Sequence, residues 1–110
     1  LEGPYTYDIL CYNVAMPGWS PEGTCIICAT IPMRGIAFEG MSQKEYVQFK
    51  DKIAVHTVKS IEEMLNMDLT GHIEELEVAT AVTLARYNNH RYGALGYEQS
   101  PTNTGQKLCL

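Results

Sequence analysis

The side chains best suited to binding a ligand gather late in the chain. Arg86 and Tyr87 stand side by side, and Tyr92, Gly93 and Tyr97 follow shortly after them. A guanidinium beside aromatic rings can form a wall against a planar ligand, and glycine lets a backbone approach that ligand closely. Tyrosines are equally suited to core packing with the hydroxyl at the surface. The residue types alone therefore favour packing over ligand binding.

Metal binding and nucleophilic catalysis have less support. The histidines, His56, His72 and His90, lack the paired spacing of a zinc or iron site, so no metal site is predicted. A nucleophile elbow of the G-x-S-x-G type is also absent from the sequence. Hydrolysis is therefore not favoured.

Two of the four cysteines, Cys25 and Cys28, have C-x-x-C spacing within the apolar run 24–31. Its β-branched residues and flanking turn signals predict a strand, on which residues three apart point to opposite faces. The two thiols should therefore share neither a metal nor a disulfide, and we expect small buried hydrophobes. Cys11 and Cys109 have no visible partner, so reduced thiols and a cytoplasmic location are expected.

The composition is typical of one globular domain over residues 1–110, with 45% hydrophobic and 19% charged residues. The net charge is −5 and the eight basic residues are scattered. Nucleic acid is therefore not expected as a partner, because binding phosphates requires clustered Lys and Arg. No apolar run approaches the roughly 18 residues that span a bilayer, and no signal segment opens the chain.

The first half of the chain predicts an antiparallel hairpin. Residues 7–14 alternate loosely and end near the turn signal Pro17-Gly18, and the run 24–31 is apolar almost throughout. The second strand should therefore be covered on both faces. A loop is expected over 32–40.

Ser42 and Glu45 have the spacing of a capping box, in which the hydroxyl and the carboxylate satisfy backbone N–H groups of a first helical turn. A long helix is expected to follow and to end over 66–71. One broad face should pack on the sheet through apolar side chains at helical spacing, namely Tyr46, Val47, Phe49, Ile53, Ala54, Val58, Ile61 and Leu65.

After this helix, leucine and valine alternate with glutamates, which predicts a strand over 73–78 with one solvated face. Glu74, Glu75 and Glu77 are expected at the surface rather than as an acid–base cluster, because neighbours on a strand alternate between faces.

Thr80 can cap a short helix over 81–87, and Asn88-Asn89 can end it. A last strand is expected over 93–98 and a mobile tail over 100–110. The expected fold class is α+β: a small, mostly antiparallel sheet packed against one long helix, plus a short second helix.

The order of several motifs resembles a known enzyme family. The run Thr80-Ala81-Val82-Thr83-Leu84-Ala85-Arg86-Tyr87, followed by Gly93-Ala94-Leu95-Gly96-Tyr97, resembles the late substrate-domain signature of FAD-dependent oxidoreductases related to phytoene desaturases, carotenoid isomerases and retinol saturases. Ala81 stands where that family has proline. Residues 15–23 are similar to its A-P-x-G motif, and residues 42–50 to its s-x-x-x-Y-x-x-x-K helix, so the resemblance spans roughly residues 10 to 100.

The resemblance implies redox chemistry at carbon–carbon double bonds of an apolar polyene or a related substrate, with FAD as the hydride carrier. No residue is assigned to catalysis. The dinucleotide motif G-x-G-x-x-G is absent, so the chain would be an excerpt of the substrate domain, without turnover of its own. The residues that it implies near the flavin or in the pocket are Thr80, Thr83, Arg86, Tyr87, Gly93, Gly96 and Tyr97.

The partners implied by the resemblance are the rest of a parent chain and an apolar small-molecule substrate. A membrane-peripheral location stays open for such a parent. The alternative is a freestanding, non-enzymatic α+β interaction module that pairs an exposed sheet edge with a partner. An excerpt should expose an apolar patch where its neighbour packs, which could also support a homodimer.

Overall fold

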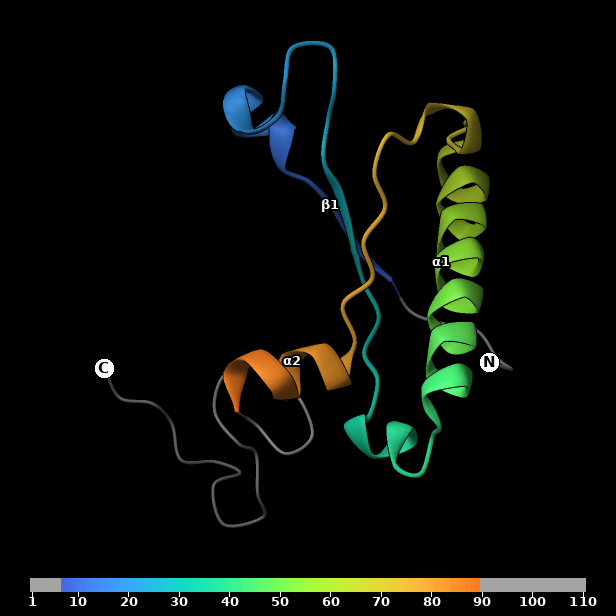
Figure 1. Ribbon diagram of the computed structural model, residues 1–110. Coiled ribbons are helices and arrows are strands. Elements are labelled where there is room, and N and C mark those ends of the chain that lie inside the picture. The colour runs from blue at the N-terminus through green and yellow to red at the C-terminus, as the bar shows by residue number, and fades with distance from the viewer. Residues whose placement is uncertain (1–6, 90–110) are drawn as a thin grey trace, which may run out of the picture.

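The computed structural model describes residues 7–89 and confirms the α+β class (Figure 1). Two strands, β1 (Asp8–Cys11) and β2 (Ile27–Thr30), form one antiparallel sheet, and the helices α1 (Gln43–Leu65) and α2 (Ala81–Asn88) follow. The long helix α1 lies along one side of the molecule and the hairpin along the other. Figure 1 shows α2 near the end where α1 begins.

The predicted hairpin is confirmed, but its strands are shorter than the runs 7–14 and 24–31. The ladder pairs Asp8 with Thr30 at one end and Cys11 with Ile27 at the other. A 3₁₀ turn follows β1 directly, so the chain leaves the ladder at once. The expectation that the second strand is covered on both faces is wrong, because this sheet has two strands among the described residues and β2 is half-buried at most.

The cysteines of the C-x-x-C motif are free, as predicted, but the expected burial is wrong for one of them. Cys25 is exposed, and Cys28 is half-buried. Cys25 precedes β2 and lies outside the ladder, so no neighbouring strand shields its thiol. Cys11 is also free and exposed.

Both predicted ends of α1 are confirmed. Ser42 Oγ accepts a hydrogen bond from Glu45 N at 3.3 Å, and Glu45 Oε2 accepts one from Ser42 N at 2.8 Å. At the other end Asn66 adopts the left-handed conformation, with φ of 50°, which asparagine tolerates better than most residues. Local sequence therefore determines where this helix begins and ends.

The buried face of α1 is narrower than predicted. Ile53 and Ile61 are the only buried hydrophobic side chains among residues 7–89, and Val47 and Leu65 are exposed. At 3.6 residues per turn, Val47 points about a third of a turn away from Ile53. Leu65 ends the helix, and the expected broad packing face therefore covers only its central part.

The strand predicted over 73–78 is wrong, because this segment is an extended connection that joins no ladder. Leu76, expected to face the core, is 54% exposed. The predicted second helix is confirmed as α2, with Thr80 as its N-cap and Asn89 in the left-handed conformation after it. The strand expected over 93–98 and the tail expected over 100–110 lie outside the described residues.

The molecule is open rather than compact. Its radius of gyration is 16.5 Å, whereas a compact domain of about 100 residues has roughly 13 Å. A small aromatic cluster near the start of α1 adds some packing, with the Phe38 ring edge-on to Tyr46 and to Phe49 at centroid distances of 6.1 and 5.2 Å. Many large apolar side chains consequently remain in solvent.

Candidate functional site

The two threonines singled out from the sequence form the N-terminal cap of α2. Thr80 Oγ1 accepts a hydrogen bond from Val82 N, and Thr83 Oγ1 accepts one from Thr80 N, each at 3.2 Å. The Tyr46 hydroxyl lies 2.7 Å from Thr80 Oγ1 and 3.5 Å from Thr83 Oγ1. Thr80 is buried. The two threonines of the T-x-x-T motif therefore connect α2 to the first turn of α1 through the Tyr46 hydroxyl.

The phenol of Tyr46 has a lowered pKa. Partial burial of Tyr46 acts to raise this pKa, but the hydrogen bonds with Thr80 and Thr83 and the positive charge of Lys50 outweigh it. The Lys50 ammonium lies 5.9 Å from the centroid of the Tyr46 ring. The hydroxyl of Tyr46 is directed to the two threonines, which suits it to holding the helices together.

The remaining candidate residues of α2 are not brought into this cluster. Arg86 is exposed, and Tyr87 is 80% exposed, so both side chains reach into solvent beyond the cap. Gly93, Gly96 and Tyr97 lie outside the described residues. Among the residues implied by the resemblance, the structure thus joins Thr80 and Thr83 to Tyr46 and leaves Arg86 and Tyr87 at the surface.

A second candidate site, which the sequence interpretation missed, is the hairpin-end loop, residues 12–26. Figure 1 shows it at the far end of the two strands, in blue to teal. The Asn13 side chain organises it from within: Nδ2 donates to Ser20 Oγ at 2.6 Å, and Oδ1 accepts from Ile26 N at 2.8 Å. One amide thus ties the start of the loop to its middle and to its end.

A tight turn completes this network. Thr24 N donates to the carbonyl of Pro21 at 3.0 Å, and Gly23 has φ of +82°, the value required at the third position of a type II turn. Glycine reaches that conformation without strain. Ser20 Oγ donates to the Thr24 carbonyl at 2.9 Å, which links the turn back to Asn13.

The apolar side chains of the hairpin-end loop point outward. Val14 is 85% exposed, Trp19 is 52% exposed, and Met16 is exposed beside them. The rings of Tyr12 and Trp19 pack against each other in a tilted arrangement, with centroids 5.2 Å apart. The loop thus combines half-buried polar groups that are hydrogen-bonded to one another with large apolar side chains that are exposed.

A sequence signal for this loop exists. Trp19 is the one tryptophan of the chain and lies among turn-forming residues, where a core tryptophan would be out of place. Asn13 can be recognised only with the structure, because its hydrogen bonds reach residues far along the loop.

Tyr7, the residue before β1, is hydrogen-bonded to the middle of α1. The Tyr7 hydroxyl lies 2.6 Å from His56 Nδ1, and Ser60 Oγ donates to the Tyr7 hydroxyl at 3.4 Å. The two rings are stacked with centroids 6.3 Å apart. These contacts give His56 a structural role in positioning the hairpin.

Residues 7–89 hold no group of three His, Cys, Asp or Glu residues that could bind a metal ion. None of the helices in this part of the chain has the length and apolar character needed to cross a membrane.

Comparison with known proteins adds no relative from which a function could be taken. No protein-family model, curated protein or solved structure matches this chain.

Proposed function

We propose that this chain is a protein-interaction module that docks through its hairpin-end loop. The observation that carries the proposal is a loop that is held by the hydrogen bonds of half-buried Asn13 and exposes Val14, Met16 and Trp19. A loop without a partner gains nothing from displaying these side chains to water. An interface gains from them, because tryptophan is enriched among the residues that dominate binding energy.

The internal hydrogen bonds of the loop support the same role. Docking is weakened by the cost of ordering flexible groups, about 0.5–1.5 kcal/mol for each immobilised side chain. Asn13, Ser20 and Gly23 fix the backbone before any partner arrives. The loop can therefore present its apolar anchors without much further ordering.

Charge favours a protein partner over a lipid or nucleic acid surface. Residues 7–33 include two acidic residues, Asp8 and Glu22, and no lysine or arginine. Both phosphates and the anionic cytoplasmic leaflet attract basic segments and repel acidic ones. An apolar protein surface carries no such penalty.

The test is selection from a random peptide library displayed on phage, with the immobilised wild-type chain as bait. We expect the enriched peptides to bind the triple variant Val14→Ser, Met16→Ser, Trp19→Ser at least about tenfold more weakly, the equivalent of about 1.4 kcal/mol. The matched control is Val47→Ser, Val55→Ser, Tyr87→Ser, which removes three other exposed apolar side chains. Peptides that bind the loop variant as tightly as the wild type would contradict the proposal.

We also propose, as a second function, that the chain belongs to the substrate domain of an FAD-dependent oxidoreductase of the phytoene dehydrogenase-related type. Its support is the order of motifs around Thr80, Thr83, Arg86 and Tyr87. Exposure of Arg86 and Tyr87 on α2 leaves both available to a ligand or flavin held by another domain. An apolar polyene or a related substrate would then lie between this chain and the rest of the parent.

A further inference from the structure

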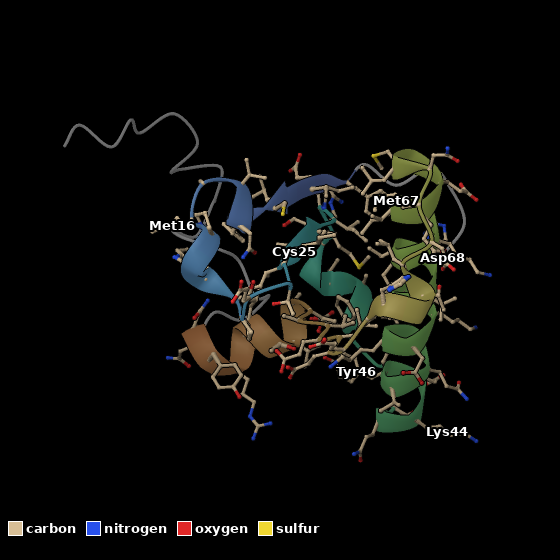
Figure 2. The ribbon with its side chains drawn as sticks, turned by 90° about the horizontal axis from the view of Figure 1, so that it is seen from above. Met16, Cys25, Lys44, Tyr46, Met67 and Asp68 are labelled. Atoms are coloured by element: carbon tan, nitrogen blue, oxygen red, sulfur yellow. The ribbon has the colours of Figure 1, made fainter. Side chains whose placement is uncertain are left out.

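The end of the molecule that carries the hairpin-end loop also carries the C-terminal end of α1 (Figure 1). Met64 and Leu65 in the last turn of α1 and Met67 beyond it are all exposed, Met67 at 56%. Figure 2, which views the molecule from this end, shows Met16 on the hairpin side and Met67 with Asp68 on the α1 side. Two exposed apolar groups thus share one end of the molecule.

Two stretches of the chain contain no basic residues. Residues 60–85 contain acidic residues and neither lysine nor arginine, and residues 7–33 contain only acidic charges as well. The lysines among the described residues all lie on α1, before its last turn. The acidic residues around the shared end are Glu22, Glu62, Glu63 and Asp68, and Glu74, Glu75 and Glu77 follow along the chain.

We propose that this end of the molecule, called the acidic end here and formed by residues 12–26 and 62–68, binds a basic amphipathic helix of a partner protein. The inference rests on the proposed docking function and specifies its partner. Leucine-type side chains on one face of such a helix would pack on Trp19, Met64 and Met67. Lysines and arginines on its flanks would face Glu22, Glu63 and Asp68.

The side chains at the acidic end suit this kind of partner. Methionine is flexible and polarisable, so it adapts to helices of different sequence. A carboxylate rim attracts cationic helices and speeds their association, and it repels acidic ones. The same rim disfavours a second copy of this chain as the occupant, because two acidic ends would face each other and the net charge is −5.

The probe is a 15-residue model peptide of lysine and leucine with leucine at helical spacing. Its matched control has glutamate in place of lysine. Trp19 is the one tryptophan of the chain, so its fluorescence reports directly on the acidic end. We expect saturable binding of the lysine peptide with a blue shift of the Trp19 emission and an affinity that falls with salt. No shift is expected with the glutamate peptide.

Two pairs of charge reversals distinguish binding at the acidic end from a general attraction between the peptide and the net negative charge of the chain. Glu63→Lys with Asp68→Lys changes the acidic end, whereas Glu39→Lys with Asp51→Lys makes the same change in net charge at exposed positions elsewhere. The first pair should weaken binding at least about tenfold and the second by less than about threefold. Met64→Ser with Met67→Ser should also weaken binding of the lysine peptide at least about tenfold.

Equal weakening by both charge-reversal pairs would overturn the inference, and so would equal binding of the two peptides. A dimer in sedimentation equilibrium that is lost with Met67→Ser would also overturn it, by making a second copy the occupant. The proposed docking function fails separately: it is lost only if the phage-selected peptides bind the loop variant as tightly as the wild type. If the selected peptides need the hairpin-end loop for binding but contain no basic residues, the docking function is supported and only the inference of a basic helix is overturned.

Discussion

At the scale of single residues, Tyr46 positions a helix that lies far along the chain. Its hydroxyl bonds Thr80, 34 residues away, and Thr80 at the same time caps α2. The cap satisfies the backbone of α2, and the tyrosine determines where that helix sits relative to α1. Helix formation and helix placement are thus controlled by one pair of hydroxyls.

Replacing Tyr46 with phenylalanine should therefore destabilise the fold. The ring can stay against Phe38, but the buried Thr80 hydroxyl loses a partner, which costs about 1–2 kcal/mol. Urea unfolding followed by circular dichroism measures the loss. Tyr87→Phe, at a hydroxyl on an 80% exposed side chain, is the control and should leave the unfolding midpoint unchanged. Equal midpoints for Tyr46→Phe and the wild type would refute this role of the hydroxyl.

Residue-level predictions from the sequence succeeded where the interaction is local. Ser42 with Glu45 is recognised by a spacing of three residues, and Thr80 by its place before a short helix, because caps depend on nearby backbone groups. The bond between Tyr46 and Thr80 and the network of Asn13 depend on chain segments that meet only after folding. No local pattern encodes them.

At the scale of elements, the end of α1 is held by a carboxylate. Glu62 Oε1 accepts hydrogen bonds from Thr70 Oγ1 and Thr70 N, each at 2.7 Å, and from Leu69 N at 2.8 Å. These bonds, that of the Thr70 side chain first, lower the pKa of Glu62. The chain reverses direction after Asn66, and Glu62 ties the reversed segment back to the helix.

The hydrogen bonds of Glu62 predict how the free energy of unfolding depends on pH. Because the pKa of Glu62 is lower in the folded state than in the unfolded chain, its contribution is complete above the unfolded pKa of about 4.3. It is lost as the pH falls through the folded value. Glu62→Gln should therefore flatten the decline of the urea midpoint between pH 6 and pH 3, whereas Glu63→Gln should keep the wild-type slope. An unchanged slope in Glu62→Gln would show that these hydrogen bonds do not form.

The mispredicted elements have a common physical origin. Alternation of leucine and valine with glutamate in 73–78 is compatible with a strand, but a strand also needs a neighbour to complete its backbone hydrogen bonds. Similarly, the run 24–31 is apolar, yet β2 is half-buried at most, because within the described residues it pairs with one strand only. Sequence pattern gives the preference of a segment, and tertiary pairing decides the outcome.

At the scale of the whole molecule, the open shape and the small hydrophobic core have the same cause: few apolar side chains are buried. Ile53 and Ile61 are the buried hydrophobic side chains of the described part, while Trp19, Met64 and Met67 face water. Small domains gain most of their stability from buried apolar area. A partner or neighbouring domain that covers these side chains should therefore stabilise the fold as well as bind it.

The resemblance to flavoenzymes makes a prediction at this scale. In the dinucleotide-binding fold, a glycine-rich turn at a helix N-terminus binds the pyrophosphate of FAD, and the chain contains no G-x-G-x-x-G motif. Titration of FAD with the isolated chain should therefore give no saturable quenching of flavin fluorescence at micromolar concentrations. Saturable quenching that disappears in Arg86→Ala would contradict this and would assign a flavin site to α2 itself.

The hydrogen bonds that shape the hairpin-end loop begin and end within residues 12–26. The hydrogen-bonded framework of the loop is thus encoded in one short contiguous stretch of the sequence. Such a stretch is a portable unit: placed on the hairpin of an unrelated scaffold, it should keep its shape and carry its binding specificity along. Evolution can exchange a segment of this kind between proteins as a whole, and the apolar anchors on its surface can then change while the Asn13 framework stays the same.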